Sequence, residues 1–495
     1  MTTLLMEAPF PDLTTGSCVG CALTLEYLIS ICTNLISYQT KMPDTTQTIV
    51  DAISDLSADG IARGIGALTT SNALPAGSRL PTVRELADAL DVSPTTVGDA
   101  WQILRRRRVI DTEGRRGSFI RDVSNGPSNR YWRVPSTGDS IRIDLGSGVP
   151  DAELLPNPLT VLNQVEEMPV VASYLARPVL GELEEVLRDL WPFTPDRMTI
   201  LNGAMDALDR LIQATVSVGD KVGISDPGFP PLYDMLDLAG AVTMPLPLDD
   251  AGLTPEAVKR AVRDGMTLLI TQPRAHNPTG VSMTIARRNE LASILAGQSV
   301  VVIEDDHSGA VSNTEMASLG AVIPEQVIHV MSFSKSHGPD FRLAAVGGAS
   351  DPIALVERRR MLGPSWSSRL LQRVLCAMLT SADVEASVKA ASAVYASRRA
   401  LLVDGLGARN ITVRGSHGLN IWVPVQDEAT AVPMLAAHGI GVARGRPFRL
   451  VHDDNHFIRV TTSAIREGAE VIVDRLAEAS AGYQEERLNE NGGRR

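Results

Sequence analysis

Short, almost purely apolar runs recur along this 495-residue chain from residue 141 onward, and they alternate with stretches of helical periodicity. Each run ends in polar or glycine-rich residues, and the clearest are 198–201, 221–224, 267–270, 300–303 and 327–331. Strands of a parallel sheet have this character because helices cover both of its faces. The pattern therefore predicts an α/β domain over residues 141–482, built on a mostly parallel sheet. Ligands of such sheets bind beyond the carboxyl ends of the strands.

The residues after the fifth run form the most specific string in the chain, Ser332-Phe333-Ser334-Lys335-Ser336-His337-Gly338-Pro339-Asp340-Phe341-Arg342. It resembles the cofactor-anchoring loop of pyridoxal 5'-phosphate (PLP) enzymes of aminotransferase fold type I, which reads S-x-S-K with an Arg seven residues after the Lys. The resemblance implies that the Lys335 amine bonds to the cofactor aldehyde, and that Ser332 and Arg342 hold its phosphate. Arg suits this role because its planar fork meets phosphate oxygens in pairs.

Two strings at the ends of earlier runs fit the same family. Residues 202–208 open a helix, and the free N–H groups of a helix N-terminus form a phosphate site. The resemblance implies that the amides of Ala204 and Met205 hold the cofactor phosphate. Residues 226–229 resemble a turn whose aromatic ring stacks on the pyridine, which would give Phe229 this role.

The polar partners of the cofactor ring are expected in two strings, His276-Asn277-Pro278-Thr279-Gly280 and Glu304-Asp305-Asp306-His307. By resemblance, Asn277 bonds the cofactor 3' oxygen. Asp305 holds the pyridinium nitrogen, whose protonation makes the ring an electron sink. His307 stands where the regulator branch of the family commonly has a Tyr that bonds the 3' oxygen, and a His can donate such a bond. The sequence leaves open whether Asp306 points inward instead of Asp305.

Two residues are candidates for binding a substrate or an effector. Gly148 resembles the glycine of a G-x-P-D motif that opens the fold, where the missing side chain lets a ligand approach the backbone; a plain turn is the alternative. Arg459 lies between apolar residues of a predicted strand, 457–460. It resembles the Arg that binds a substrate carboxylate, and a surface Arg is the alternative.

A different pattern precedes the α/β domain. Thr82 and Glu85 form a T-x-x-E capping box at the start of one short helix, and Ser93 caps a second one. Apolar residues at helical spacing, Val97, Trp101 and Leu104, give the second helix its buried stripe. Two such helices joined by a short turn are a helix-turn-helix. Residues 110–120, with a basic glycine-rich centre, then predict a two-stranded wing.

This segment resembles the gntR family of bacterial regulators over about residues 45–121, with the patterns G-x-x-L-P-x-x-R-x-L-A and S-x-x-T-V. N-terminal residues of a recognition helix reach base edges and phosphates. Pro94 departs from the family, which often carries Arg there, and this puts the operator preference in doubt. Residues 105–108 are four arginines that suit phosphate contacts, or else a solvated helix end. The DNA-binding residues that the resemblance implies are Arg84, Ser93, Thr95, Thr96 and Arg115.

Composition limits the remaining possibilities. The net charge of −12 excludes a basic nucleic-acid coat, so any DNA-binding surface must be local. Four Cys make no disulfide framework, and a reducing cytoplasm is expected.

Residues 1–41 hold an apolar run without a preceding Lys or Arg, which excludes a secretory signal. We expect a poorly structured extension there, with a membrane span interrupted by Glu26 as the alternative. Residues 122–140 predict a linker, and 483–495 a disordered tail.

The two halves together resemble the MocR subfamily of gntR regulators, over about residues 45–480. This implies a cytoplasmic homodimer without membrane contact, whose large domain binds PLP and senses PLP, a small amino compound, or both, while the small domain binds operator DNA. One alternative is a working PLP-dependent aminotransferase that relies on Lys335, Asp305 and Arg459, against which His307 and Asp340 count. Another is a regulator that has lost PLP and keeps the large domain for dimerisation alone.

Overall fold

The computed structural model describes residues 45–481, except Asn72, Ala76, 107–108, 113–116, 121–129, 131–140, 166–173, Leu175 and His452. It divides into two compact units, Met1–Ser124 and Asn125–Arg495. The expected N-terminal extension, the expected tail and nearly all of the expected linker lie outside the described residues. In the part of the chain that is described, no helix is long and apolar enough to cross a membrane.

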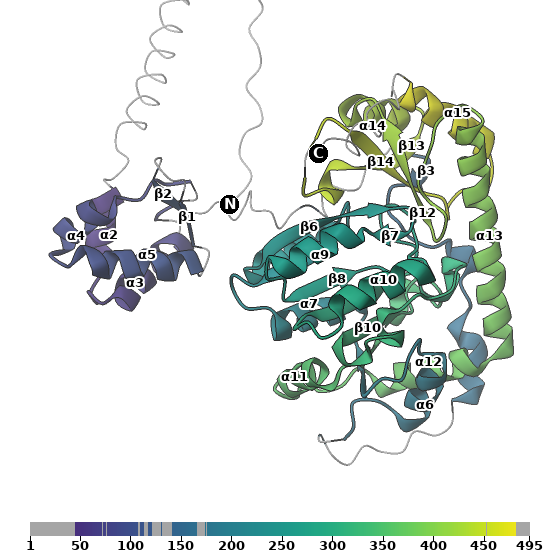
Figure 1. The fold of residues 1–495 in the computed structure, drawn as a ribbon, viewed down its shortest axis with the longest axis horizontal. Helices are drawn as coiled ribbons and strands as arrows, with labels where there is room; N and C mark the ends of the chain where they lie inside the picture. Colours follow the sequence, from purple (N-terminus) through teal and green to yellow (C-terminus); the bar gives the residue numbers. More distant parts are fainter. Residues whose placement is uncertain are drawn as a thin grey trace, which may run out of the picture. The chain divides into compact units, whose positions relative to one another are not determined.

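The first unit is a helix-turn-helix with a wing (Figure 1). Its helices are α2 (Thr45–Ala52), α3 (Ala58–Thr70), α4 (Val83–Leu90) and α5 (Pro94–Arg106). The predicted capping box is present: Glu85 N donates to Thr82 Oγ1 at 3.2 Å, and Thr82 N donates to Glu85 Oε2 at 2.8 Å. Ser93 Oγ accepts from Thr95 N at 3.3 Å at the start of α5. The predicted stripe of Val97, Trp101 and Leu104 is buried in the core of this unit.

The wing consists of β1 (Ile110–Thr112) and β2 (Ser118–Ile120), paired antiparallel. Residues 78–80 join it as a further extended segment, since Leu80 N donates to Ser118 O and Ile120 N donates to Ser78 O, both at 2.8 Å. The wing is thereby fixed to the chain that leads into α4. Its predicted basic tip, residues 113–116, lies outside the described residues.

The second unit contains an eight-stranded sheet with the order β4-β11-β10-β9-β8-β5-β6-β7. Strands β10, β9, β8, β5 and β6 run parallel, whereas β11 is antiparallel to both of its neighbours and β7 to β6. The predicted fold class is therefore confirmed. The strands are β4 (Arg197–Leu201), β5 (Lys221–Asp226), β6 (Val242–Asp249), β7 (Gly252–Leu253), β8 (Leu268–Thr271), β9 (Val301–Asp306), β10 (Val327–Ser332) and β11 (Ala344–Gly348).

Helices cover this sheet because its strands are apolar on both faces. One core joins α7, α8 and α11 to the strands, and another joins α9 and α10 to them. A third core lies between α6, α12 and the first half of α13. These helices are α6 (Gly181–Leu190), α7 (Ala204–Thr215), α8 (Pro230–Ala239), α9 (Pro255–Arg263), α10 (Ile285–Leu295), α11 (Ser350–Met361), α12 (Arg369–Thr380) and α13 (Ala382–Gly407).

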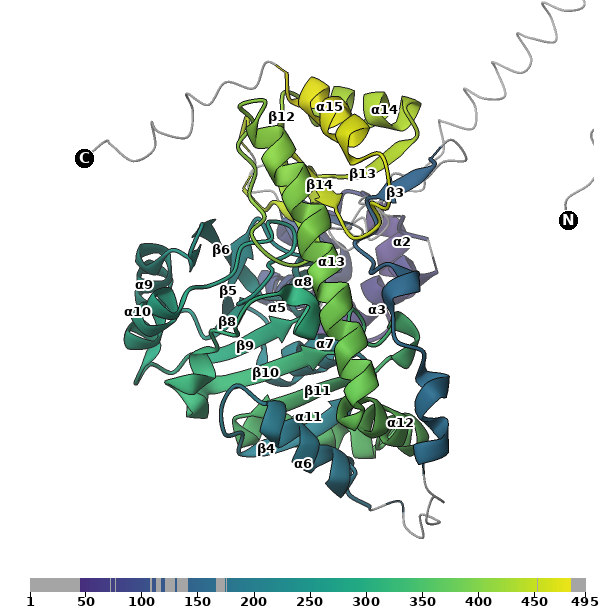
Figure 2. The ribbon, with the colours of Figure 1, turned by 90° about the vertical axis from the view of Figure 1, so that its right-hand side faces the viewer.

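A smaller α/β subdomain completes the unit. Its sheet has the order β12-β14-β13-β3, from β3 (Ile143–Leu145), β12 (Asn420–Val425), β13 (Ile440–Arg444) and β14 (His456–Thr461). Helices α14 (Glu428–Ala437) and α15 (Ala469–Ser480) pack on it. The long helix α13 runs from the large sheet to the small one (Figure 2), and its residues Leu402 and Leu406 enter the core of the subdomain.

Short 3₁₀ helices fill several connections: η3 (Ala152–Leu154), η4 (Pro158–Gln164), η5 (Gly309–Ser312), η6 (Leu319–Ala321), η7 (Pro324–Gln326), η8 (Pro339–Phe341) and η9 (Arg446–Phe448). Two of them bear on function. η8 ends directly before Arg342, the last residue of the string around Lys335, and η9 lies between β13 and β14 of the small sheet. The latter segment therefore connects the subdomain to the carboxyl edge of the large sheet, where Phe448 O accepts from Gly228 N at 2.8 Å.

Candidate functional site

The carboxyl ends of three adjacent parallel strands converge on one polar cluster. Asp305 is the penultimate residue of β9, Gln272 follows β8, and Lys335 follows β10. The register pairs Thr271 with Glu304, so the ends of β8 and β9 stand side by side. This edge is where an open α/β sheet binds its ligands.

The two neighbouring carboxylates, Asp305 and Asp306, have opposite environments although both are buried. Asp305 Oδ2 accepts from Gln272 Nε2 at 2.7 Å, while its Oδ1 has no hydrogen-bond partner in the described part of the chain. Burial raises the pKa of Asp305 to about 6. Asp306 uses both oxygens for Arg274, at 2.7 and 2.5 Å. Burial opposes ionisation of Asp306, but the Arg274 charge outweighs it and lowers the pKa of that carboxyl. Asp305 therefore retains the free oxygen.

Lys335 lies among other predicted site residues. Its Nζ donates to the carbonyl of Gly148. Burial, together with the charge of Arg459, lowers the pKa of Lys335 to about 8. Gly148 has a left-handed φ of 70°, and a Cβ built on it would lie 3.3 Å from both Nη1 and Nη2 of Arg459. Gly148 is thus required at this point both by its backbone and by the approach of Arg459.

Arg459 is buried, which excludes the alternative of a surface Arg. Its Nη1 donates to Asn277 Oδ1 at 3.2 Å, and its Nη2 donates to the carbonyl of Gly146. The guanidinium also lies over the ring of Phe448, with its carbon 5.0 Å from the ring centroid. Asn277 N in turn donates to Gln272 Oε1 at 2.9 Å. Gln272 therefore joins the carboxylate of Asp305 to the loop of Asn277.

His307 is held in a way that the sequence could not reveal. Its Nε2 lies 2.9 Å from the carbonyl of Ala275, which can only accept, so Nε2 carries a proton that is already donated. Ser308 Oγ lies 3.4 Å from Nδ1. Burial, and then the charge of Lys335, lower the pKa of His307 to about 4. The ring is therefore neutral at pH 7 with Nδ1 as an acceptor. The N–H of His307 is thus directed at Ala275, and its bond to a cofactor oxygen stays a prediction.

Arg342, one of the predicted phosphate-binding residues, lies beside the start of α7. Gly203, with φ of 93°, precedes this helix, and no side chain caps it. A Cβ on Gly203 would lie 3.6 Å from Cζ of Arg342, so the guanidinium of Arg342 stands beside the first amides, those of Ala204 and Met205. An uncapped helix N-terminus with an adjacent Arg suits a phosphate.

Three further residues of these strings, Ser332, Phe229 and Asp340, differ in how far they are buried. Ser332 is buried, and its Oγ accepts from Ser334 N at 3.4 Å. Phe229 is half-buried immediately before α8, against the core that α7 and α8 share. Asp340 is exposed, as is Arg342.

The predicted DNA-binding residues lie at the starts of two helices. Arg84 is in the first turn of α4, Ser93 precedes α5, and Thr95 is in its first turn; all three are exposed. Thr96 is half-buried, and Arg115 lies outside the described residues. Arg79, which was not among the predicted residues, also exposes its side chain at the wing, with its Nε 3.4 Å from a Cβ built on Gly117.

Sequence reasoning also missed Gln272 and Arg274, which follow β8 in the same way that the predicted residues follow their strands. Their position after an apolar run was the available signal. Without a motif attached, that signal does not distinguish them from other loop residues. They decide the difference between the two carboxylates, since Gln272 leaves Asp305 one free oxygen and Arg274 uses both oxygens of Asp306.

Comparisons with known proteins agree with both units. Residues 140–476 match the family of class I and II aminotransferases, and residues 58–120 match the gntR family of bacterial regulatory proteins. The chain is 33% identical over 400 residues to the vitamin B6 salvage pathway transcriptional repressor PtsJ of Salmonella typhimurium, covering 80% of this chain and 91% of that protein. It is 24% identical over 400 residues to the pyridoxine biosynthesis transcriptional regulator PdxR of Corynebacterium glutamicum, covering 77% and 84%.

Solved aminotransferase structures share the fold of the large unit. Kynurenine aminotransferase of Pyrococcus horikoshii superposes with a TM-score of 0.62 at 20% identity, covering 69% of this chain and 91% of that one. The α-aminoadipate aminotransferase LysN of Thermus thermophilus, complexed with a phosphopyridoxyl-leucine, gives 0.62 at 19%, covering 72% and 97%. At such identities the likeness concerns the fold alone.

Proposed function

This chain belongs to the MocR subfamily of gntR-family regulators, and from that premise we propose that its large domain binds PLP through Lys335 and senses it. The protein is a DNA-binding transcriptional regulator with an aminotransferase-like domain, a fold whose members bind PLP. We further propose that a small amino compound, captured at the same site, is a second input. The observation that carries the proposal is the buried, unpartnered Oδ1 of Asp305 at the strand edge that also carries Lys335.

The residues present fit PLP at each of its functional groups. Arg342 and the amides of Ala204 and Met205 would hold the phosphate, and Asp305 would hold the pyridinium nitrogen. A buried carboxylate without a second partner is unfavourable by itself, and a cationic ring nitrogen would relieve that cost. Ser332, Phe229 and Asn277 would complete the site as phosphate, ring and 3' oxygen neighbours.

Bound PLP supplies an aldehyde that reacts with amines and a ring that withdraws electrons. The chain's own residues prepare this reaction. With a pKa of about 8, the Lys335 amine is neutral in roughly a tenth of molecules at pH 7, far more often than an ordinary lysine. Arg459 offers its guanidinium to an incoming carboxylate beside Gly148, where the missing side chain leaves room.

Sensing accounts for the site better than efficient turnover does. His307 is neutral and its N–H is already donated to Ala275, so it neither donates that hydrogen bond to a ligand nor carries a positive charge at pH 7. Two relatives, named for vitamin B6 salvage and for pyridoxine biosynthesis, support PLP as the sensed compound. A ligand shifts DNA affinity only by its differential affinity for the two states of the protein.

The decisive experiment follows the visible absorption of PLP titrated into the full-length protein. We expect a band from Lys-bound cofactor in the wild type and none in Lys335→Ala, with Lys389→Ala as control because that lysine is exposed on α13. Operator affinity is then measured with and without PLP. Absence of the band in the wild type would refute PLP binding. A band without any change in operator affinity would refute sensing, and repeated turnover with amino acids would favour the enzyme instead.

DNA contact and self-association complete the proposal. Arg84→Ala should abolish operator binding while the cofactor band persists, because Arg84 is exposed on α4 in a separate unit. A homodimer agrees with the apolar side chains exposed around the end of α11, including Leu362, which is 91% exposed. Light scattering on the purified protein tests the dimer, and a monomeric mass at micromolar concentration would contradict it.

A further inference from the structure

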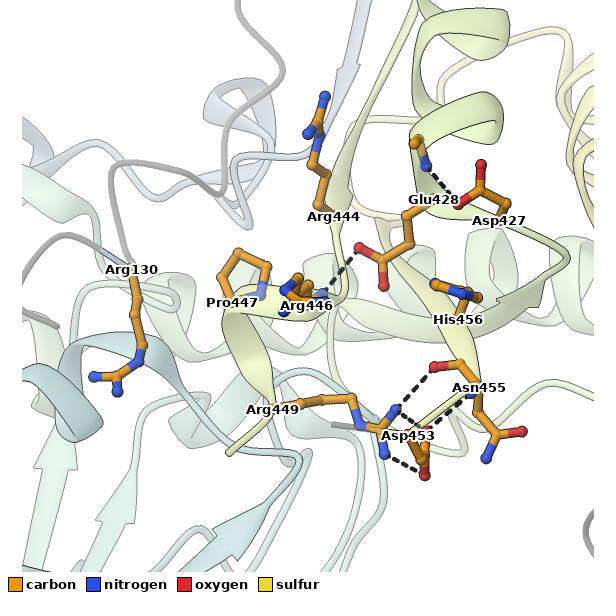
Figure 3. Close-up of a pocket in the computed structure, with 11 residues that line it drawn as sticks. Arg130, Asp427, Glu428, Arg444, Arg446, Pro447, Arg449, Asp453, Asn455 and His456 are labelled. Carbon is orange, nitrogen blue, oxygen red and sulfur yellow. Dashed lines mark hydrogen bonds and ion pairs between the residues drawn. The ribbon is translucent and has the colours of Figure 1, made fainter. Parts of the chain in front are cut away.

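A cavity of about 500 Å³ opens in the smaller subdomain, and it shares no lining residue with the cluster around Lys335 (Figure 3). Its wall comes from the start of α14, the end of β13, the η9 segment and the start of β14. Arg130, the described residue of the segment between the two domains, also lines it. Pockets of this size accommodate small molecules.

The acidic residues of the wall are already engaged within the protein. Asp453 receives two hydrogen bonds from Arg449, at 2.6 and 2.7 Å, which hold the pKa of Asp453 well below its usual range. Glu428 accepts the backbone N–H of Arg446 at 3.0 Å and that of Phe457 at 3.4 Å. Arg449 thereby neutralises Asp453, whereas Glu428 is hydrogen-bonded to the backbone and keeps its negative charge.

Asp427, the remaining acid of the wall, caps α14. It accepts from the backbone of Ala429 at 3.1 Å and from Thr430 N at 3.0 Å. These hydrogen bonds stabilise the carboxylate, and those from Thr430 and Ala429 lower the pKa of Asp427. The carboxylate therefore serves the helix N-terminus rather than the opposite wall of the cavity.

Two cations of the wall lack such partners. The exposed guanidiniums of Arg444 and Arg446 make no hydrogen bond, ion pair or ring contact with any residue that the structure describes. His456, half-buried at the start of β14, also lines the wall. Four arginines and three carboxylates line the cavity, so its formal charge is +1. Guanidinium groups pair with phosphate and carboxylate oxygens in a planar, two-bond geometry.

We propose that this cavity is a second ligand site, which takes a small anion with a phosphate or carboxylate group and holds it between Arg444 and Arg446. This goes beyond the proposed sensing of PLP and does not depend on it. A concave site of this size favours a small molecule over a DNA backbone.

The η9 segment connects this site to the cofactor cluster. Arg446 and Arg449 face the cavity, whereas Phe448 between them packs its ring against Arg459. The Phe448 carbonyl accepts from Gly228 N at 2.8 Å and from Tyr233 Oη at 3.1 Å. An anion that shifts Arg446 therefore acts on the residue that supports Arg459. We expect the two sites to influence each other's affinity, and this coupling must be reciprocal.

The test titrates inorganic phosphate, and separately succinate, into full-length protein saturated with PLP, so that the phosphate site at α7 is filled. Calorimetry should detect binding of one or both anions, and the pair of probes distinguishes phosphate from carboxylate recognition. The double variant Arg444→Gln/Arg446→Gln should bind at least about tenfold more weakly. The control is Arg260→Gln/Arg263→Gln, which removes the same charge from exposed positions on α9.

Several outcomes would overturn the proposal. These are equal affinity in the two double variants, no binding of either anion, and a loss of operator affinity in Arg444→Gln/Arg446→Gln with anion binding unchanged, which would make this surface a DNA contact. Unchanged thermal unfolding of the variant excludes misfolding. If PLP itself fails to bind, the phosphate probe can also bind at the empty site at the start of α7. Neither double variant changes that site, so the difference in phosphate affinity between the two variants still reports on the cavity alone.

Discussion

Gln272 acts at the scale of a single residue, because it hydrogen-bonds Asp305 with its amide nitrogen and the backbone of Asn277 with its amide oxygen. Gln272→Leu should therefore weaken PLP binding about tenfold, since it leaves Asp305 without its donor and loosens the Asn277 loop. Equilibrium dialysis measures the affinity. Gln298→Leu, at an exposed position, is the control, and equal losses in both variants would contradict a positioning role for Gln272.

The protonation of Asp305 makes a pH-dependent prediction for the cofactor-free protein. Burial raises its folded-state pKa from 3.8 to about 6, so the folded state binds this proton more tightly than the unfolded chain does. The contribution to stability is thus present below about pH 4 and is lost as the pH rises to about 6. Asp305→Asn should stabilise the cofactor-free protein by on the order of 2 kcal/mol above pH 6. It should do little below pH 4, and it should weaken PLP binding.

Thermal unfolding at pH 4 and pH 7.5 measures this difference. Asp306→Asn is the matched control, because that residue is paired with Arg274 and its loss should destabilise the protein instead. Stabilisation by both substitutions, or by neither, would mean that the two carboxylates do not differ as their hydrogen bonds indicate.

A substitution at Gly148 tests whether ligand binding depends on the space beside Arg459 or on the backbone conformation of the glycine. Gly148→Ala places a methyl group 3.3 Å from the Arg459 guanidinium at a φ of 70°. We expect PLP binding to persist while the affinity for carboxylate-bearing amines falls about tenfold or more, which spectral titration measures. Gly219→Ala has a comparable φ of 93° with no atom within 4 Å of the new Cβ. An equal effect of both substitutions would assign the change to strain alone.

These residues also show what the sequence could and could not predict. Lys335, Asp305 and Asn277 were recognisable because each lies in a string after an apolar strand. The strand runs themselves agree with β4, β5, β8, β9 and β10 to within a few residues. The hydrogen bond from Asn277 N to Gln272 and the one between His307 and the Ala275 carbonyl both depend on the course of a loop, which no periodicity in the sequence encodes. The pairing of β3 could not be predicted either, because β3 joins a sheet made of residues almost 300 positions later.

At the scale of an element, α4 carries both the stability and the contact surface of the DNA-binding unit. Thr82→Ala removes the capping box and should reduce the stability of this helix by about 1 kcal/mol. Hydrogen exchange of the α4 amides in the full-length protein would detect it as about a fivefold faster opening. Arg84→Ala, in the same turn but exposed, should leave exchange unchanged and abolish operator binding. Reversed effects of the two substitutions would contradict this division of roles.

At the scale of the whole molecule, the two units can influence each other only through structure that links them, and Arg130 is such a link. Its backbone N–H and guanidinium bond Asp234 at 3.1 and 2.9 Å, the guanidinium bonds Asp237 at 2.7 Å, and its carbon lies 5.8 Å from the ring centroid of Tyr233. These partners belong to α8, the helix that begins directly after Phe229. Arg130 itself is therefore fixed to the helix that follows Phe229, the proposed neighbour of the cofactor ring.

We accordingly expect Arg130→Gln to weaken the coupling between PLP binding and operator binding, while PLP itself still binds. Operator affinity should still be measurable, and the affinity for PLP should change less than threefold. The ratio of operator affinities with and without PLP should fall toward one, from a coupling that is typically about 5- to 150-fold in allosteric proteins. Fluorescence anisotropy with labelled operator measures the ratio. Arg197→Gln, which breaks an ion pair with Glu357 elsewhere in the large unit, is the control. An unchanged ratio in Arg130→Gln would mean that the signal leaves the large domain by another route, such as a change in the arrangement of two protomers.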